Sequence, residues 1–193
     1  DVIGFDTHAE KVEVLKKKKS PIEDQYLIDN IPKFPFEATT DASRLADADI
    51  VLICVPTPVD EMYYPDLEPV ISAATLSAEH LKKGALVVLE STVNPGVSEE
   101  VIRPIFEEHG HKLGKDVFIA HCPERINPGD EKWNVTNIPR VVGAFDAKGL
   151  KMALDNRRID PLETDDLDFI DLWRVAPGDL DFSRPGGISS FAD

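Results

Sequence analysis

The pattern of hydrophobic and polar residues divides the chain into short apolar runs and longer amphipathic segments. The runs VIGF (2–5), FEAT (36–39), IVLICV (50–55), ALVVLES (85–91) and VFIAHC (117–122) predict strands, and residues 8–18, 67–81 and 97–109 predict helices. Most of the runs are nearly continuous rather than alternating, which is typical of strands covered on both faces. The pattern therefore predicts an α/β fold with a doubly wound parallel sheet.

Composition narrows the class of protein. The 193 residues are 42% hydrophobic, enough for one well-buried domain. A formal net charge of -15 argues against a nucleic-acid partner, because binding to phosphates depends on clustered cations. No apolar run approaches the roughly 20 residues that cross a bilayer, so we expect neither a membrane span nor an export signal. The two cysteines fit a reducing, cytoplasmic location.

Polar or turn-forming residues follow four of the predicted strands. Asp6 follows the first, Pro56-Thr57-Pro58 the third, Ser91-Thr92 the fourth and Pro123-Glu124-Arg125 the fifth. Ligands of doubly wound sheets bind beyond the carboxyl ends of the strands. We therefore expect the functional site along this edge.

Asp6 is a candidate ligand for a dinucleotide. A carboxylate at the end of the second strand of such a fold can accept hydrogen bonds from the adenosine ribose diol, and it repels a 2'-phosphate, so it indicates NAD rather than NADP. The structural alternative is that Asp6 or Thr7 caps the helix starting near His8. The two roles are compatible.

A dinucleotide fold also needs a strand and a Gly-rich turn before residues 1–6, with a helix amino terminus facing the pyrophosphate. The pattern G-x-G-x-x-G occurs nowhere in the 193 residues. We therefore expect a fragment that lacks the first βα unit of a Rossmann-like sheet.

Five stretches together resemble one enzyme family. They are DVIGFDTHAEKVEVLKKKKSPIED, IVLICVPTP, LVVLESTVNPGVSEEVI, CPERINPGD and NIPRVVGA, in the order and at roughly the spacing of the nucleotide-sugar 6-dehydrogenases. That family includes UDP-glucose, UDP-N-acetylglucosamine and UDP-N-acetylmannosamine dehydrogenases. The resemblance covers residues 1–153, which we expect to form an NAD-binding domain.

The resemblance implies an activity and a set of site residues. Members of the family oxidise the C6 alcohol of a UDP-sugar to a carboxylate in two NAD-dependent steps, in polysaccharide biosynthesis, and CPERINPGD is more similar to the N-acetylhexosamine branch than to the glucose branch. Catalytic roles are implied for Glu124 and Thr92, and substrate contacts for Glu124 and Arg125. Cofactor contacts are implied for Asp6, Lys11, Val55, Pro56, Thr57, Ser91 and Thr92.

Each of these residues also has a structural alternative. Pro56-Thr57-Pro58 suits any rigid turn at a sheet edge. Ser91 and Thr92 could cap the next helix, for which Ser98 is also available. Glu124 could serve only in an ion pair, with Arg125 or Arg140.

Metal binding and thiol chemistry are disfavoured. His109, His111, His121 and Cys122 lack a paired cysteine spacing, so we expect no metal site. No recognisable spacing places a base beside Cys122, which argues against a nucleophilic role.

The resemblance ends near Ala153. The family continues with a central helix, through which the parent enzyme is expected to form a homo-oligomer, and with a GGHC segment whose cysteine binds the intermediate covalently. Residues 154–193 show neither element, and we expect an acidic, irregular tail, in which an out-of-frame reading is one hypothesis. The chain is then expected to be inactive alone. A β-hydroxyacid dehydrogenase and a non-catalytic nucleotide-binding or interaction module remain as alternatives.

Overall fold

The computed structural model describes residues 1–125 and 138–156. The strands are β1 (Ile3–Phe5), β2 (Glu37–Thr39), β3 (Ile50–Ile53), β4 (Ala85–Leu89), β5 (Val117–His121) and β6 (Gly143–Ala144). The α-helices are α1 (Ala9–Lys16), α2 (Gln25–Asn30), α3 (Glu68–His80), α4 (Arg103–Glu108) and α5 (Ala147–Asn156). Short 3-10 helices span Ile31–Lys33 and Ala42–Asp47, and a π-helix spans Ser98–Ile102.

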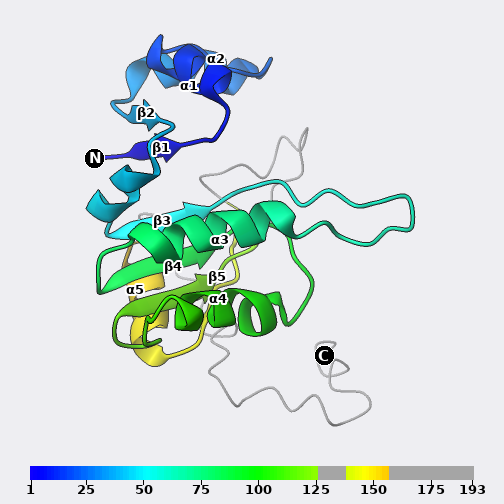
Figure 1. Ribbon diagram of the computed structural model, residues 1–193. Helices are drawn as coiled ribbons and strands as arrows, with labels where there is room; N and C mark the ends of the chain where they lie inside the picture. Colours follow the sequence, from blue (N-terminus) through cyan, green and yellow to red (C-terminus); the bar gives the residue numbers. More distant parts are fainter. Residues whose placement is uncertain (126–137, 157–193) are drawn as a thin grey trace, which may run out of the picture.

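The core is a four-stranded sheet in the order β3-β4-β5-β6, parallel except for β6 at its edge. Helices α3 and α4 cover one face and α5 covers the other (Figure 1). Successive side chains of β4 alternate between these layers, with Val87 facing α3 and α4 and Leu86 and Val88 facing α5. All five residues of β4 are buried, which confirms the prediction of a parallel strand covered on both faces.

The first two strands form a separate sheet. β1 pairs in parallel with β2, while β3 begins the four-stranded sheet, so the six strands form two hydrogen-bonded units rather than one. The outer strand β3 is correspondingly less covered than β4, and its Leu52 is 55% exposed. The prediction of an α/β fold with a parallel sheet is confirmed. The structure adds that β1 and β3 are not hydrogen-bonded to each other, so the strands form two sheets.

The predicted strands end earlier than their apolar runs. β3 stops at Ile53 rather than at residue 55, where the chain enters a proline-rich turn, and β4 stops at Leu89 rather than at residue 91. Residues 54–58 and 90–92 therefore lie in the loops that follow these strands, at the edge of the sheet.

The predicted helix over 97–109 is divided. Its first turn is a π-helix, Ser98–Ile102, which continues directly into α4. Pro104 lies at the start of α4 and has no N–H to donate to the preceding turn, which accounts for the irregular hydrogen bonding there. Helices α2 and α5 and the strand β6 were not predicted.

Part of the CPERINPGD stretch and residues 157–193 of the expected tail lie outside the described residues. Within the described part of the chain, no helix combines the length and the apolar character needed to cross a bilayer.

Candidate functional site

The carboxyl ends of β3, β4 and β5 bring three loop segments together. Ser91 connects the first two, because its hydroxyl lies 2.7 Å from the carbonyl oxygen of Val55 and 3.3 Å from that of Ile53. The backbone N–H of Glu124 donates to the carbonyl of Glu90, at 3.3 Å, and so joins the second segment to the third. Three of the four predicted edge segments therefore meet at one edge of the larger sheet.

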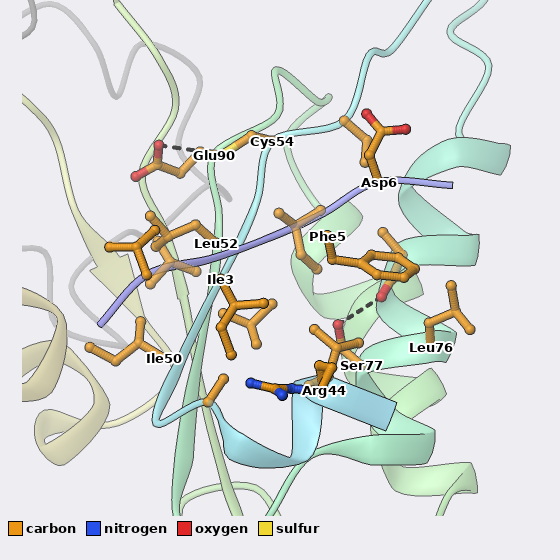
Figure 2. A pocket seen from close by; sticks show the side chains of 18 of the residues that line it. Ile3, Phe5, Asp6, Arg44, Ile50, Leu52, Cys54, Leu76, Ser77 and Glu90 are labelled. Carbon is orange, nitrogen blue, oxygen red and sulfur yellow. Dashed lines mark hydrogen bonds between the residues drawn. The ribbon is translucent and has the colours of Figure 1, made fainter. Parts of the chain in front are cut away.

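Asp6 lies at the carboxyl end of β1, on the margin of a cleft between the two sheets (Figure 2). Its Oδ1 accepts the backbone N–H of His8 at 2.8 Å, and its Oδ2 lies 3.8 Å from the Nζ of Lys11. His8 is the N-cap residue of α1 and makes no side-chain capping bond of its own. Asp6 thus supports the start of α1, as the structural alternative proposed, while 35% of its side chain stays exposed.

Thr57, Ser91 and Thr92 have structural contacts of their own. The hydroxyl of Thr57 donates to the carbonyl of Thr92 at 2.8 Å, which ties the proline-rich turn to the end of β4. Ser91 is buried and bonded to the end of β3, while Thr92 is exposed. The half-buried Val55 and the exposed Pro56 lie along the same turn.

Glu124 forms an ion pair with Arg140. Its Oε2 accepts from Nη2 of Arg140, and its Oε1 accepts the backbone N–H of Arg125 at 2.7 Å. Nη1 of Arg140 lies 3.5 Å from Oε2 of Glu90. One guanidinium therefore bridges two carboxylates that follow neighbouring strands.

The bridge is unequally buried. The side chains of Arg140 and Glu90 are 11% and 14% exposed, whereas that of Glu124 is 39% exposed. Burial by itself would lower the pKa of Arg140, but the carboxylates of Glu124 and Glu90 outweigh it and raise that pKa. Arg140 is thus a fixed positive charge that orients Glu124 toward the accessible side.

Cys54 lies beside this bridge. Its Sγ is 3.8 Å from Oε2 of Glu90, and burial within the cleft, together with the charge of Glu90, raises the pKa of the thiol to about 11. Although the residue is exposed to the cleft, the thiol is therefore protonated at neutral pH. Cys122 is fully buried and lies inside the core layer beneath α5.

The histidines singled out in the sequence lie apart. A ring nitrogen of His109 lies 2.7 Å from the carbonyl oxygen of Ile105, and one of His111 lies 2.7 Å from that of Ala78. Burial lowers the pKa of His121, against the opposing effect of a hydrogen bond to the backbone of Leu89. Within 1–125 and 138–156, no three His, Cys, Asp or Glu side chains gather closely enough to hold a metal ion.

The position of Glu90 was the main feature missed by sequence reasoning. The sequence places Glu90 only within the run ALVVLES and assigns it no role, whereas its carboxylate faces Arg140, 50 residues later. The stretch VLEST does carry a signal, because a charged residue directly after a fully buried strand needs a partner. The sequence spacing does not indicate that this partner is Arg140.

The cleft between the two sheets has a volume of about 1850 Å³. Figure 2 shows Ile3 and Phe5 of β1 and Ile50 and Leu52 of β3 around it, with Asp6, Cys54 and Glu90 at one end. The cleft is thus apolar along its length and polar at the carboxyl ends of the strands, which is typical of a ligand site in an α/β sheet.

Comparison with known proteins identifies relatives of the chain. Protein CapL of Staphylococcus aureus is 35% identical over 155 residues, covering 80% of this chain and 36% of CapL. The UDP-N-acetyl-D-glucosamine 6-dehydrogenase of Pseudomonas aeruginosa is 36% identical over 143 residues, covering 72% of this chain and 33% of that protein. The chain thus spans about a third of the length of these relatives.

Solved structures agree with the sequence relatives. The NDP-N-acetyl-D-galactosaminuronic acid dehydrogenase of Methanosarcina mazei Go1 has a TM-score of 0.75 and 34% identity, covering 80% of this chain and 35% of that one. The family model described as UDP-glucose/GDP-mannose dehydrogenase family, NAD binding domain, matches residues 1–155. The chain therefore belongs to the UDP-glucose/GDP-mannose dehydrogenase family and carries its NAD-binding, Rossmann-like domain.

Proposed function

We propose that this chain is the cofactor-binding part of an NAD-dependent nucleotide-sugar 6-dehydrogenase whose substrate is a UDP-N-acetylhexosamine. Residues 1–153 form its NAD-binding domain, and the chain alone does not turn over. The observation that carries the proposal is Glu124, which Arg140 holds at the carboxyl edge of the sheet within the segment matched by the family. The preference for an N-acetylhexosamine rests on the names of relatives such as the Pseudomonas aeruginosa enzyme.

The residues around Asp6 fit the adenosine end of NAD. Asp6 lies at the end of β1 among the residues that line the cleft, and its Oδ2 is approached only loosely by Lys11, at 3.8 Å. That oxygen can accept hydrogen bonds from a ribose diol while Oδ1 continues to hold the start of α1. Within this proposal Lys11, Val55, Pro56, Thr57, Ser91 and Thr92 complete the cofactor contacts.

When bound, NAD takes up hydride from the substrate alcohol. The role of this chain is to hold a proton acceptor near that alcohol. Glu124 suits the role because it is partly exposed and fixed through both oxygens, by Arg140 and by the N–H of Arg125. Thr92, exposed one strand away, is the second catalytic candidate, and Arg125 is the candidate for substrate binding.

Neither cysteine of the chain suits a covalent step. A thiolate is the reactive species, and the raised pKa of Cys54 keeps its thiol protonated at neutral pH. Cys122 is shielded from any substrate by complete burial. This supports the proposal that the complete oxidation needs residues which these 193 do not supply.

A chimera tests the function. In the chimera, residues 1–155 of this chain replace the matching segment of the Pseudomonas aeruginosa relative. The rest of that enzyme is left unchanged. We expect NADH formation with UDP-N-acetylglucosamine or UDP-N-acetylmannosamine in preference to UDP-glucose, measured at 340 nm. The free 193-residue chain should form none.

Two substitutions in the chimera test the site. Glu124→Gln keeps the shape of the side chain but removes the proton acceptor, and a fall in kcat of about 10²-fold to 10⁴-fold is expected. Glu108→Gln makes the same change at an exposed position of α4 and should leave the rate unaltered. If the chimera folds and both variants match the parent rate, the proposed role of Glu124 is wrong. If the free 193-residue chain forms NADH, the proposal that it needs the rest of the enzyme for turnover is wrong.

A further inference from the structure

Glu90 occupies a fixed place at the carboxyl edge of the larger sheet. Its backbone N–H donates to the carbonyl of Ile53 at 2.9 Å, and its own carbonyl accepts the N–H of Glu124 at 3.3 Å. The residue is thus bonded on one side to the end of β3 and on the other to the segment that follows β5. The side chain of Glu90 therefore projects from a backbone that is held on both sides.

The carboxylate of Glu90 is largely removed from solvent, as is the guanidinium of Arg140. Taking an ionised carboxylate out of water is costly unless it is paired and hydrogen-bonded. Here Oε2 lies 3.5 Å from Nη1 of Arg140 and 3.8 Å from Sγ of Cys54. A neutral side chain at this position would avoid the cost of burying a charge, so the presence of a carboxylate calls for an explanation.

Glu90 and Glu124 bind different nitrogens of Arg140. Nη1 faces Glu90, and Nη2 donates to Glu124. A guanidinium is planar and its N–H groups point in fixed directions, so carboxylates at both terminal nitrogens determine its orientation. Held by Glu124 alone, the guanidinium would follow the movements of a side chain that is 39% exposed. Glu90 therefore anchors Arg140 from the buried side.

Glu90 also changes the electrostatic environment of Glu124. A cation beside a carboxylate favours the ionised form, and so makes that carboxylate a weaker proton acceptor. A second carboxylate on the same cation opposes this effect, because a like charge nearby favours protonation. One cation between two carboxylates leaves an excess of one negative charge at the bridge. The proton-accepting capacity of Glu124 thus depends on Glu90 as well as on Arg140.

The neighbouring segments carry four other groups that titrate or bear charge. They are Cys54 after β3, His121 and Cys122 at the end of β5, and Arg125 beside Glu124. Burial raises the pKa of Cys54 and lowers that of His121, so both are uncharged near neutral pH. Cys122 is buried beside Arg140, and the exposed Arg125 is screened by water. Glu90 is thus the second carboxylate on this guanidinium, and replacing it tests the effect.

We propose that Glu90 is a positioning residue that acts on Glu124 through Arg140. It fixes the orientation of the guanidinium and offsets its charge, so that Glu124 keeps both its place and its capacity to accept a proton. The inference rests on the proposed function, because it takes Glu124 as the proton acceptor.

Carbon-13 NMR of the intact 193-residue chain tests the electrostatic part. The carboxyl signal of Glu124, identified by its loss in Glu124→Gln, is followed against pH. We expect Glu90→Gln to lower its titration midpoint by at least about half a pH unit, because the guanidinium then acts on Glu124 without an opposing charge. Glu108→Gln removes the same charge from the exposed surface of α4 and should leave the midpoint in place.

A second variant and the unaltered protein test the anchoring part. Glu90→Asp keeps the charge but sets it one methylene further back, so the midpoint should stay close to that of the parent. In the parent, Nη1 and Nη2 of Arg140 should give separate nitrogen-15 signals, because each is held by its own carboxylate. An unshifted midpoint in folded Glu90→Gln, or a single averaged Nη signal in the parent, would overturn the proposal.

Kinetics of the chimera separate this inference from the proposed function. Glu90→Gln should move the acid limb of the pH–kcat profile to lower pH and reduce the plateau at least about twofold, because a weaker acceptor takes up the proton less readily. The KM for the UDP-sugar should change little, and Glu90→Asp should recover most of the plateau. If Glu124→Gln matches the parent rate, the proposed function fails. If Glu124→Gln lowers the rate while Glu90→Gln leaves the pH profile and kcat unchanged, the positioning role alone is wrong.

Discussion

Cys54 and Cys122 differ in the two properties that govern thiol reactivity, accessibility and ionisation. Cys54 is exposed, but its pKa of about 11 means that about one thiol in a hundred is ionised at pH 9, whereas Cys122 is buried. We expect native protein to react with iodoacetamide at a single cysteine, with a rate that rises steeply between about pH 9 and pH 11. Mass spectrometry of the alkylated peptides checks both points.

The charge of Glu90 contributes to this raised pKa, so Glu90→Gln should shift the pH–rate curve for Cys54 toward lower pH. The sign follows because a neighbouring negative charge disfavours the thiolate, and removing it favours ionisation. Glu108→Gln, on the exposed surface of α4, should leave the curve in place. A midpoint near the ordinary value of 9.0 in the unaltered protein would contradict the environment described for Cys54.

At the scale of elements, the turn before the π-helix depends on one glycine. Gly96 has φ +96, and a Cβ there would lie 3.2 Å from a carboxylate oxygen of Glu100. We expect Gly96→Ala to lower the free energy of unfolding by about 1 to 3 kcal/mol, measured by urea denaturation. Gly143→Ala is the matched change in β6, where the added Cβ meets nothing within 4 Å, and it should cost less than about 0.5 kcal/mol. Equal losses would show that backbone strain at Gly96 is not the cause.

The same elements show what the sequence could predict and why the rest was hidden. Continuous apolar runs identified β4 and β5 because burial on both faces leaves a local signature. The two residues of β6 are too few to carry a periodicity, and their pairing with β5 is set by tertiary contacts. The π-helix was missed because an apolar helical period does not report which backbone hydrogen bonds a proline removes.

For the candidate site, the sequence predicted edge segments but not their mutual contacts. Strand ends placed Thr57, Ser91 and Glu124 at one edge, since parallel strands share a direction. The bridge from Arg140 to Glu90 joins positions 50 residues apart, so no local sequence pattern reports it. The roles of these residues toward NAD and the sugar stay predictions, of which the chimera variants test that of Glu124.

At the scale of the whole molecule, the open edges of β1 and β3 bear on colloidal stability. Unpaired strand edges promote association between copies, and the charge of -15 opposes it by mutual repulsion. Added salt weakens that repulsion, because the screening length falls from about 10 Å at 0.1 M to about 3 Å at 1 M. We expect light scattering to detect oligomers at 1 M NaCl that are absent at 0.1 M.

A lysine in the cleft should suppress this association. Leu52→Lys puts a charge on the β3 edge, whereas Met62→Lys adds the same charge to an exposed loop, where it should have little effect. If both variants associate like the parent at high salt, the strand edges are not the contact. Otherwise the excess of acidic residues acts as a solubility device, because repulsion between negatively charged copies keeps their unpaired strand edges from meeting.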